Sequence, residues 1–236
     1  MFKLNNKVIQ IYLDGPNLDQ LSNCDKNLVD GFTFNPTLFK SLGANDYLSF
    51  CEQIIKIENI KPVSLEIISD DYETTISQAK KLSSLSRNVV VKVPISFTNG
   101  ESTYDVIDYL VQRKINLNIT AIFTLDQIKK ILPIIKDTDS ILSVFAGRLY
   151  DIGIDAKIKM REISDYVKAN SNCRLLWASP RMIYDVVSSL ETNTEIITIQ
   201  YNLLQKLNLF GLHPEKYSLE TVKMFYNDAL SSNYKI

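Results

Sequence analysis

Short apolar runs, many of them rich in β-branched residues, alternate along this chain of 236 residues with longer segments in which apolar residues recur at helical spacing. Strands that alternate with helices favour parallel pairing, because two parallel strands need a crossover between them. Eight such units in about 200 residues predict an α/β fold, a single (β/α)8 TIM barrel. The predicted strands are Val8–Leu13, Gly31–Asn35, Val63–Ile68, Val89–Ile95, Leu117–Phe123, Ile141–Ala146, Arg174–Ala178 and Glu195–Ile199.

Helices are predicted between most of these strands and again after the last one. An extra C-terminal helix is expected over Leu219–Ser231, with Ser218 as its cap and Glu220 in its first turn. We therefore expect one barrel domain over residues 1–236, with residues 218–231 as the C-terminal helix. An apolar face on that helix could pack on its own barrel or on a second copy of the chain, so a homo-oligomer is one of the alternatives. The other predicted helices are Asp46–Ile57, Tyr72–Leu85, Thr103–Arg113, Leu125–Ile135, Ile154–Ala169 and Pro180–Leu190.

An open, doubly wound parallel sheet is the alternative fold. Such sheets usually have fewer strands and often a glycine-rich first turn that binds a nucleotide phosphate. The chain has seven glycines and contains neither GxGxxG nor GxxxxGK[ST]. The barrel is therefore preferred, and dinucleotide or nucleoside triphosphate binding loses its main support.

The charge balance and the length of the apolar runs exclude several classes of partner. The 26 basic and 27 acidic residues give a formal net charge of −1, without a basic stripe for nucleic acid or a membrane surface. The apolar runs are too short to span a bilayer. Residues 1–10 carry Lys3 and Lys7 but no apolar core, so we expect no signal peptide. We expect a cytoplasmic protein that binds neither nucleic acid nor membranes.

The cysteines and the histidine narrow the chemistry further. Cys24, Cys51 and Cys173 show no metal-ligand spacing, and their odd number suits a reducing compartment without a disulfide framework. The single histidine, His213, precedes a proline in a predicted C-terminal loop. A catalytic histidine dyad or a multi-histidine zinc site is therefore not expected, and neither is a metal ion.

Polar side chains recur near the carboxyl ends of the predicted strands, where TIM barrels carry their chemistry. Each has a plain structural explanation when it is taken singly: Asp14 and Ser179 could cap helices, and the arginines could pair with surface carboxylates. Together, these residues would bring acids, amides, hydroxyls, an amine and guanidiniums to the same end of the barrel. The residues are Asp14, Thr33, Asn35, Glu66, Lys92, Asn118, Thr120, Ser143, Arg148, Ser179 and Arg181.

Two charged residues stand inside apolar strands. Lys92 lies in the run Val89–Ile95, and Glu66 lies in Val63–Ile68. Burying either charge is costly unless the group is paired or functional. Lys92 alone could be a strand-end lysine whose ammonium reaches solvent. With the other polar residues, it suggests an amine that attacks a ketose carbonyl to form a Schiff base.

The rest of the inventory fits that reaction. A carboxylate would remove the hydroxyl proton on the carbon beyond the bond that breaks, so that an aldehyde leaves. Amides and hydroxyls would hold the sugar hydroxyls, and arginines would bind a phosphate with two parallel hydrogen bonds. The protonated imine is itself the electron sink, so no organic cofactor is expected. The expected partners are sugar phosphates.

Seven segments, in order and each on its expected strand, make the chain resemble the transaldolase family over most of its length. The resemblance implies a class I aldolase-type barrel in carbohydrate metabolism, such as the pentose phosphate pathway. The segments are Tyr12-Leu-Asp14, Gly31-Phe-Thr-Phe-Asn-Pro-Thr-Leu38, Val63-Ser-Leu-Glu66, Val91-Lys-Val-Pro94, Asn116-Leu-Asn-Ile-Thr120, Ser143-Val-Phe-Ala-Gly-Arg148 and Ala178-Ser-Pro-Arg181.

The resemblance also implies a role for each site residue. Lys92 would be the Schiff-base lysine, and Asp14 would be the acid/base for carbon–carbon cleavage. Glu66 and Thr120 would hold and activate the water used in forming and hydrolysing the imine. The remaining residues would bind substrate, with amides and hydroxyls on the dihydroxyacetone part and Arg148, Ser179 and Arg181 on the phosphate. These binding residues are Thr33, Asn35, Asn118, Ser143, Arg148, Ser179 and Arg181.

The family has a branch that transfers the dihydroxyacetone unit and a branch, the fructose-6-phosphate aldolases, that releases it. The releasing branch has Gln where this chain has Glu66, and Tyr where it has Phe145, and it lacks the pair matching Asn118 and Thr120. We therefore expect a transaldolase that uses a ketose phosphate of the fructose 6-phosphate or sedoheptulose 7-phosphate type. Release of dihydroxyacetone and a non-catalytic sugar-phosphate-binding barrel are the alternatives.

Overall fold

The computed structural model describes residues 1–4, 6–58, 60–232 and 234. It divides into two compact units, Met1–Leu204 and Gln205–Ile236, and each is described by itself. The expectation of one domain over the whole chain stays a prediction.

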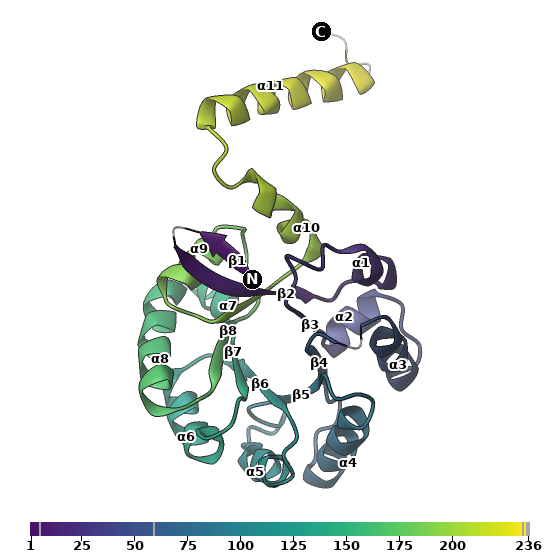
Figure 1. The fold of residues 1–236 in the computed structure, drawn as a ribbon, viewed down its shortest axis with the longest axis vertical. Helices are drawn as coiled ribbons and strands as arrows, with labels where there is room; N and C mark the ends of the chain where they lie inside the picture. The colour runs from purple at the N-terminus through teal and green to yellow at the C-terminus, as the bar shows by residue number, and fades with distance from the viewer. Residues whose placement is uncertain (5, 59, 233, 235–236) are drawn as a thin grey trace. The chain divides into compact units, whose positions relative to one another are not determined.

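The first unit is a closed parallel barrel, as predicted. Each strand pairs with the next along the chain, and β2 pairs with β9 to close the ring (Figure 1). An additional strand that the sequence did not indicate, β1 (Phe2–Leu4), pairs antiparallel with β2. The barrel strands are β2 (Lys7–Asp14), β3 (Gly31–Thr33), β4 (Val63–Glu66), β5 (Val89–Pro94), β6 (Leu117–Ile122), β7 (Ile141–Val144), β8 (Arg174–Trp177) and β9 (Ile196–Ile199).

Helices surround the ring on its outside (Figure 1). The predicted helix over Leu125–Ile135 has the same bounds in the structure, where Thr124 caps it. Most of the other predicted helices differ from their predicted bounds by no more than two residues at either end. The helices of this unit are α1 (Leu18–Asn23), α2 (Pro36–Ser41), α3 (Tyr47–Ile57), α4 (Tyr72–Ser83), α5 (Tyr104–Gln112), α6 (Leu125–Ile135), α7 (Ala146–Asp151), α8 (Ala156–Asn170), α9 (Asp185–Glu191) and α10 (Tyr201–Leu204).

Three predicted boundaries are wrong where a strand passes into the helix that follows. Asn35 ends no strand but is the N-cap of α2, and Ala146 is the first residue of α7. The helix expected from Pro180 begins only at Asp185, because the Asp185 carboxylate accepts hydrogen bonds from the backbone N–H groups of Arg181 and Met182 and holds them in a loop. Short helices thus follow directly on several strands.

The interior of the barrel is filled by side chains. A buried cluster joins Tyr12, Val90, Ile141, Leu176, Ala178 and Ile196, which come from five different strands or their ends. The Tyr12 ring lies over the backbone of Gly31 on the neighbouring strand: a Cβ built on Gly31 would come within 2.6 Å of the ring. Strands buried on both faces explain why the predicted runs are apolar throughout.

The second unit contains a short 3-10 helix, Gln205–Leu209, and the C-terminal helix α11 (Pro214–Ser231). The helix begins earlier than predicted because Pro214 occupies the first turn, where a missing N–H costs nothing, and His213 is the capping residue. Among the described residues, no helix is both long enough and apolar enough to cross a membrane.

Candidate active site

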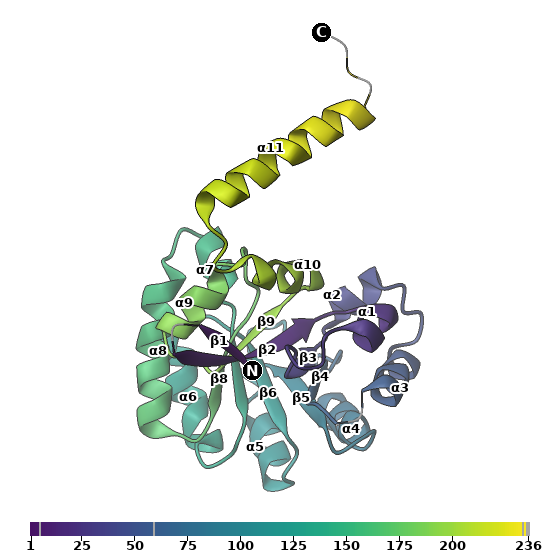
Figure 2. The same cartoon turned by 45° about the horizontal axis from the view of Figure 1, so that its top comes forward.

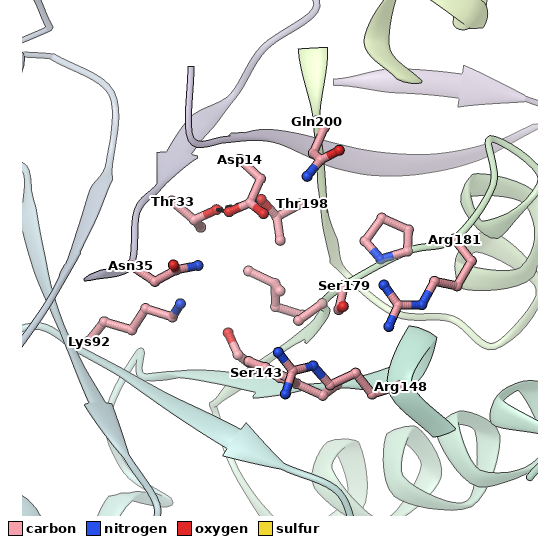
Figure 3. Close-up of a pocket in the computed structure, with 14 residues that line it drawn as sticks. Asp14, Thr33, Asn35, Lys92, Ser143, Arg148, Ser179, Arg181, Thr198 and Gln200 are labelled. Carbon is pink, nitrogen blue, oxygen red and sulfur yellow. Dashed lines mark hydrogen bonds between the residues drawn. The ribbon is translucent and has the colours of Figure 1, made fainter. Parts of the chain in front are cut away.

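A pocket of about 300 Å³ opens at the carboxyl ends of the barrel strands (Figure 3). The short helices α2, α7 and α10 lie at this end, directly after β3, β7 and β9 (Figure 2). Eight of the predicted site residues line the pocket, and Glu66, Asn118 and Thr120 do not. The lining consists of Asp14, Thr33, Asn35, Lys92, Ser143, Phe145, Arg148, Leu176, Ala178, Ser179, Pro180, Arg181, Thr198 and Gln200.

Lys92 does not reach solvent, because only 5% of the residue is exposed. Its Nζ lies 2.9 Å from Oε2 of Glu66, whose strand runs beside that of Lys92 with the two residues in register. A buried ammonium needs such a partner, since desolvation would otherwise penalise its charge. The pair explains how two charged residues are accommodated in apolar strands, and it leaves the Lys92 amine on the pocket wall.

Asp14 lies at the end of β2, on the pocket wall, where a chain of hydroxyls holds it. Thr33 Oγ1 donates to Asp14 Oδ1 at 2.6 Å, and Thr198 Oγ1 lies 2.6 Å from the same Thr33 oxygen. Since Thr33 has one proton to donate, Thr198 must be the donor in the second bond. Burial raises the pKa of the Asp14 carboxyl above its ordinary value of 3.8, although the nearby Lys92 ammonium and the Thr33 hydrogen bond oppose that rise.

A second set of hydrogen-bonded polar side chains lies deeper in the barrel than the pocket. Ser143 Oγ donates to Asn118 Oδ1 at 2.6 Å, and the Asn118 amide donates to Ser64 Oγ at 3.1 Å. Asn118 is fully buried and its amide is engaged by these two serines, so Ser143 alone of the three lines the pocket. Thr120 lies on the same face of β6, and its buried hydroxyl has no hydrogen-bond partner among the described residues.

Two guanidiniums line the side of the pocket away from Lys92 (Figure 3). Arg181 is held by Asp151, whose Oδ1 accepts from the Arg181 Nε at 2.9 Å and whose Oδ2 accepts from Nη2. Arg148 has no carboxylate partner among the described residues, and its guanidinium lies 5.3 Å from the centre of the Phe145 ring. The pocket therefore has a positively charged end that suits an anion with several oxygens.

Backbone geometry brings the two arginines together. Ser179 adopts a φ of 59°, in the left-handed region that few residues with a side chain occupy. Gly147, beside Arg148, packs so tightly here that a Cβ on it would lie 1.5 Å from the Ser179 carbonyl oxygen. The segments that carry Arg148 and Arg181 thus meet in direct backbone contact.

Asn35 both stabilises a helix and lines the pocket. Its side-chain oxygen accepts from the Leu38 N–H at 3.0 Å, which caps α2, while the residue also lines the pocket. Helix capping, which the sequence suggested for Asp14 and Ser179 only, is thus a role of Asn35. The suggestion is wrong for Asp14 and Ser179, because Asn17 caps α1 and the N-cap position of α9 is Tyr184.

Two polar lining residues, Thr198 and Gln200, were not anticipated from the sequence. Both come from the end of β9, and the rule that chemistry gathers at carboxyl strand ends would have found them. Asp151 and Asp185, which hold the side chain and the backbone of Arg181, gave no such signal because each lies in a helix. Among the described residues, no group of three His, Cys, Asp or Glu side chains is placed to hold a metal ion.

Solved structures similar to this one support the barrel fold alone, because the identities are low. A 2,3-dimethylmalate lyase of the PEP mutase/isocitrate lyase superfamily aligns with a TM-score of 0.60 at 12% identity, covering 93% of this chain and 84% of that one. An N-acetylneuraminate lyase from Mycoplasma synoviae aligns with a TM-score of 0.53 at 13% identity, covering 95% and 79%.

Sequence relatives are more informative. A protein from Methanococcus maripaludis named "Probable transaldolase" is 32% identical over 201 residues, covering 84% of this chain and 89% of its own. One of the same name from Thermoplasma acidophilum is 32% identical over 207 residues, covering 84% and 87%. Residues 11–234 match the family model described as Transaldolase/Fructose-6-phosphate aldolase, so the chain belongs to the transaldolase/fructose-6-phosphate aldolase family.

Proposed function

We propose that this protein is a transaldolase that moves a dihydroxyacetone unit from a ketose phosphate to an aldose phosphate through a Schiff base on Lys92. The observation that carries the proposal is the buried Lys92 amine, which is paired with Glu66 and shares one pocket with Asp14 and two arginines. Binding alone does not require a buried amine, so this arrangement favours an enzyme over a sugar-phosphate-binding barrel. Family membership and the names of the relatives support the same class of reaction.

The first step joins Lys92 to C2 of the ketose. Glu66, 2.9 Å from the ammonium, takes one proton from it, so that the amine nitrogen can attack the carbonyl carbon. The former carbonyl oxygen then leaves as water, with that proton returned by Glu66 and a second proton that the nitrogen gives up as the carbon–nitrogen double bond forms. The balance is an ammonium and a ketone giving a protonated imine and one water. The Thr120 hydroxyl, which has no hydrogen-bond partner among the described residues, lies on β6, the strand beside that of Lys92, and would hold that water for the reverse, hydrolytic step.

The second step breaks the C3–C4 bond. The Asp14 carboxylate removes the C4 hydroxyl proton, C4 becomes an aldehyde carbon, and the bonding pair moves into the imine to give an enamine. Burial raises the pKa of the Asp14 carboxyl above its ordinary value, which favours the return of the proton in the reverse direction. Its hydrogen bond from Thr33 fixes the carboxylate's orientation.

Transfer reverses these movements with a different aldehyde. The enamine carbon attacks the carbonyl carbon of the acceptor, protonated Asp14 gives its proton to the new hydroxyl, and hydrolysis of the imine frees the new ketose and the Lys92 ammonium. Arg148 and Arg181 would bind the phosphate of donor and acceptor alike. Retention of the enamine until an acceptor arrives is what separates transfer from release, and Glu66 and Phe145 are the residues that favour transfer here.

Borohydride trapping tests the proposal. Reduction in the presence of fructose 6-phosphate or sedoheptulose 7-phosphate should inactivate the enzyme and leave a stable secondary amine on the peptide that contains Lys92, as read by mass spectrometry. Lys92→Arg keeps the charge but forms no imine, and Lys92→Met removes the charge, so neither should be labelled or active. Labelling elsewhere, or no labelling with any ketose phosphate, would overturn the proposal.

A product assay separates transfer from release. Incubation with fructose 6-phosphate alone should give little free dihydroxyacetone, and addition of an aldose phosphate should give a new ketose phosphate. Free dihydroxyacetone at the same rate with and without the acceptor would instead assign the chain to the releasing branch.

A further inference from the structure

We propose that Gln200 is a specificity-determining residue that recognises the hydroxyl on the carbon next to the aldehyde of the acceptor. This carbon becomes C5 of the product ketose. The assignment assumes the reaction proposed above, with C2 on Lys92, the C4 hydroxyl on Asp14 and the phosphate between Arg148 and Arg181.

The position of Gln200 follows from strand register. Strands β2 and β9 are parallel, and their last paired residues are Leu13 and Ile199, so Asp14 and Gln200 are the next neighbours across the strand pair. Side chains alternate along a strand, and Thr198 faces the barrel interior, where it contacts Thr33. Gln200, two residues further, therefore lies on the same face, one layer nearer the mouth.

The pocket view agrees with this placement. Gln200 is one of the lining residues, and it lies beside Asp14 on the side towards Arg181 (Figure 3). In a ketose that reaches from Asp14 to the arginines, the carbon between C4 and the phosphate-bearing carbon would lie nearest the Gln200 amide. In a hexulose 6-phosphate, that carbon is C5 and it carries one hydroxyl.

The chemistry of the amide suits a hydroxyl. A glutamine side chain offers both a carbonyl acceptor and an N–H donor, so it can accept from and donate to the same group. No hydrogen bond of the Gln200 side chain is found among the described residues. By contrast, Thr33 is hydrogen-bonded to Thr198, and Ser143 to Asn118. Its backbone carbonyl serves separately, accepting from Leu203 and Leu204 at the start of α10.

A competition experiment tests the assignment. The full chain receives sedoheptulose 7-phosphate as donor and an equimolar mixture of D-glyceraldehyde 3-phosphate and 3-phosphooxypropanal, which lacks the hydroxyl. The ratio of fructose 6-phosphate to its 5-deoxy analogue reports the ratio of kcat/KM for the two acceptors, because both compete for one enamine. Gln200→Leu should lower this preference about 3- to 10-fold, the loss of one hydrogen bond, through the hydroxylated acceptor alone.

Two controls make the result interpretable. Gln53→Leu replaces a glutamine on the exposed outer face of α3 and should leave the preference unchanged. Trapping of dihydroxyacetone on Lys92 by borohydride should be unchanged in Gln200→Leu, since dihydroxyacetone ends at C3 and does not reach Gln200.

The outcomes are distinct. Normal trapping with an unchanged preference, or with an equal loss for both acceptors, would overturn the role of Gln200 and leave the Schiff-base reaction standing. Absence of trapping in the unmodified protein would overturn the proposed reaction and the role of Gln200 with it.

Discussion

The proposed reaction needs Asp14 as a carboxylate, but burial of Asp14 favours the protonated form. Burial raises the pKa of its carboxyl, so the folded state holds the proton more tightly than the unfolded state does. The folded state then binds more protons at pH values between the unfolded and folded pKa, and stability falls as pH rises through that interval. The ionised carboxylate that the reaction needs is thus a group that the fold accommodates at a cost.

Asp14→Asn tests this at the residue scale. The variant should lose at least about 100-fold in kcat, because a general acid–base is removed. Borohydride trapping on Lys92 with dihydroxyacetone should survive, since the first step does not use Asp14. The free energy of unfolding of the unmodified protein should fall relative to that of Asp14→Asn as the pH rises above about 4, the ordinary pKa of the carboxyl, as measured by urea denaturation at a series of pH values. A difference between the two proteins that stays constant with pH would contradict the assigned cause.

The charged residues of the site could be predicted from the sequence, but the residues that hold them in position could not. Lys92 and Glu66 could be recognised because a charge in an apolar strand needs a reason. Asp151 could not, because a carboxylate on a helix is ordinary until the fold brings it to Arg181. Gln200 follows a predicted strand and could have been found by that position, but the sequence does not show that barrel closure brings it beside Asp14.

At the scale of elements, the site depends on one close approach between the start of α7 and the loop after β8. Gly147 has no room for a Cβ there, since the clash would be with the Ser179 carbonyl, a backbone group that cannot rotate away. The two segments carry Arg148 and Arg181. Their separation is therefore set by the absence of a side chain at Gly147.

Gly147→Ala should push these segments apart. We expect KM for fructose 6-phosphate to rise about tenfold or more as the two guanidiniums lose their joint contact with phosphate, and the free energy of unfolding to fall by about 1–3 kcal/mol. Trapping of unphosphorylated dihydroxyacetone on Lys92 should keep its concentration dependence. An equal weakening for both compounds would show that the glycine supports the barrel generally and not the positively charged end of the pocket.

Element types were easier to predict than element ends. Runs of apolar residues indicated all eight barrel strands, because most of their side chains are buried on both faces. The ends were misplaced at Asn35, Ala146 and Pro180, where the chain leaves a strand and enters a helix or loop through a cap or a side-chain hydrogen bond. Such bonds join residues a few positions apart and leave no periodic trace, although they shape the pocket rim.

At the scale of the whole barrel, closure depends on packing that no local pattern specifies. The pairing of β2 with β9 joins segments almost the length of the unit apart, and β2 also supplies Tyr12 to the buried interior cluster. Tyr12 contacts the bare backbone of Gly31 on β3, so the ring takes the space that a side chain would fill. Strand β2 therefore contributes both to the closure of the barrel and to the packing of its interior.

Gly31→Ala should lower the free energy of unfolding by about 1–3 kcal/mol, because the new methyl group overlaps the Tyr12 ring in a packed interior. Tyr12→Leu should also destabilise, since it removes ring atoms from the core. Leucine lacks the atoms that the methyl would strike, so the double variant should lose at least about 0.5 kcal/mol less than the sum of the single losses. Urea denaturation of the four proteins measures this coupling. Strictly additive losses would mean that the strand shifts to admit the methyl group, and that the Tyr12–Gly31 contact does not set the distance between β2 and β3.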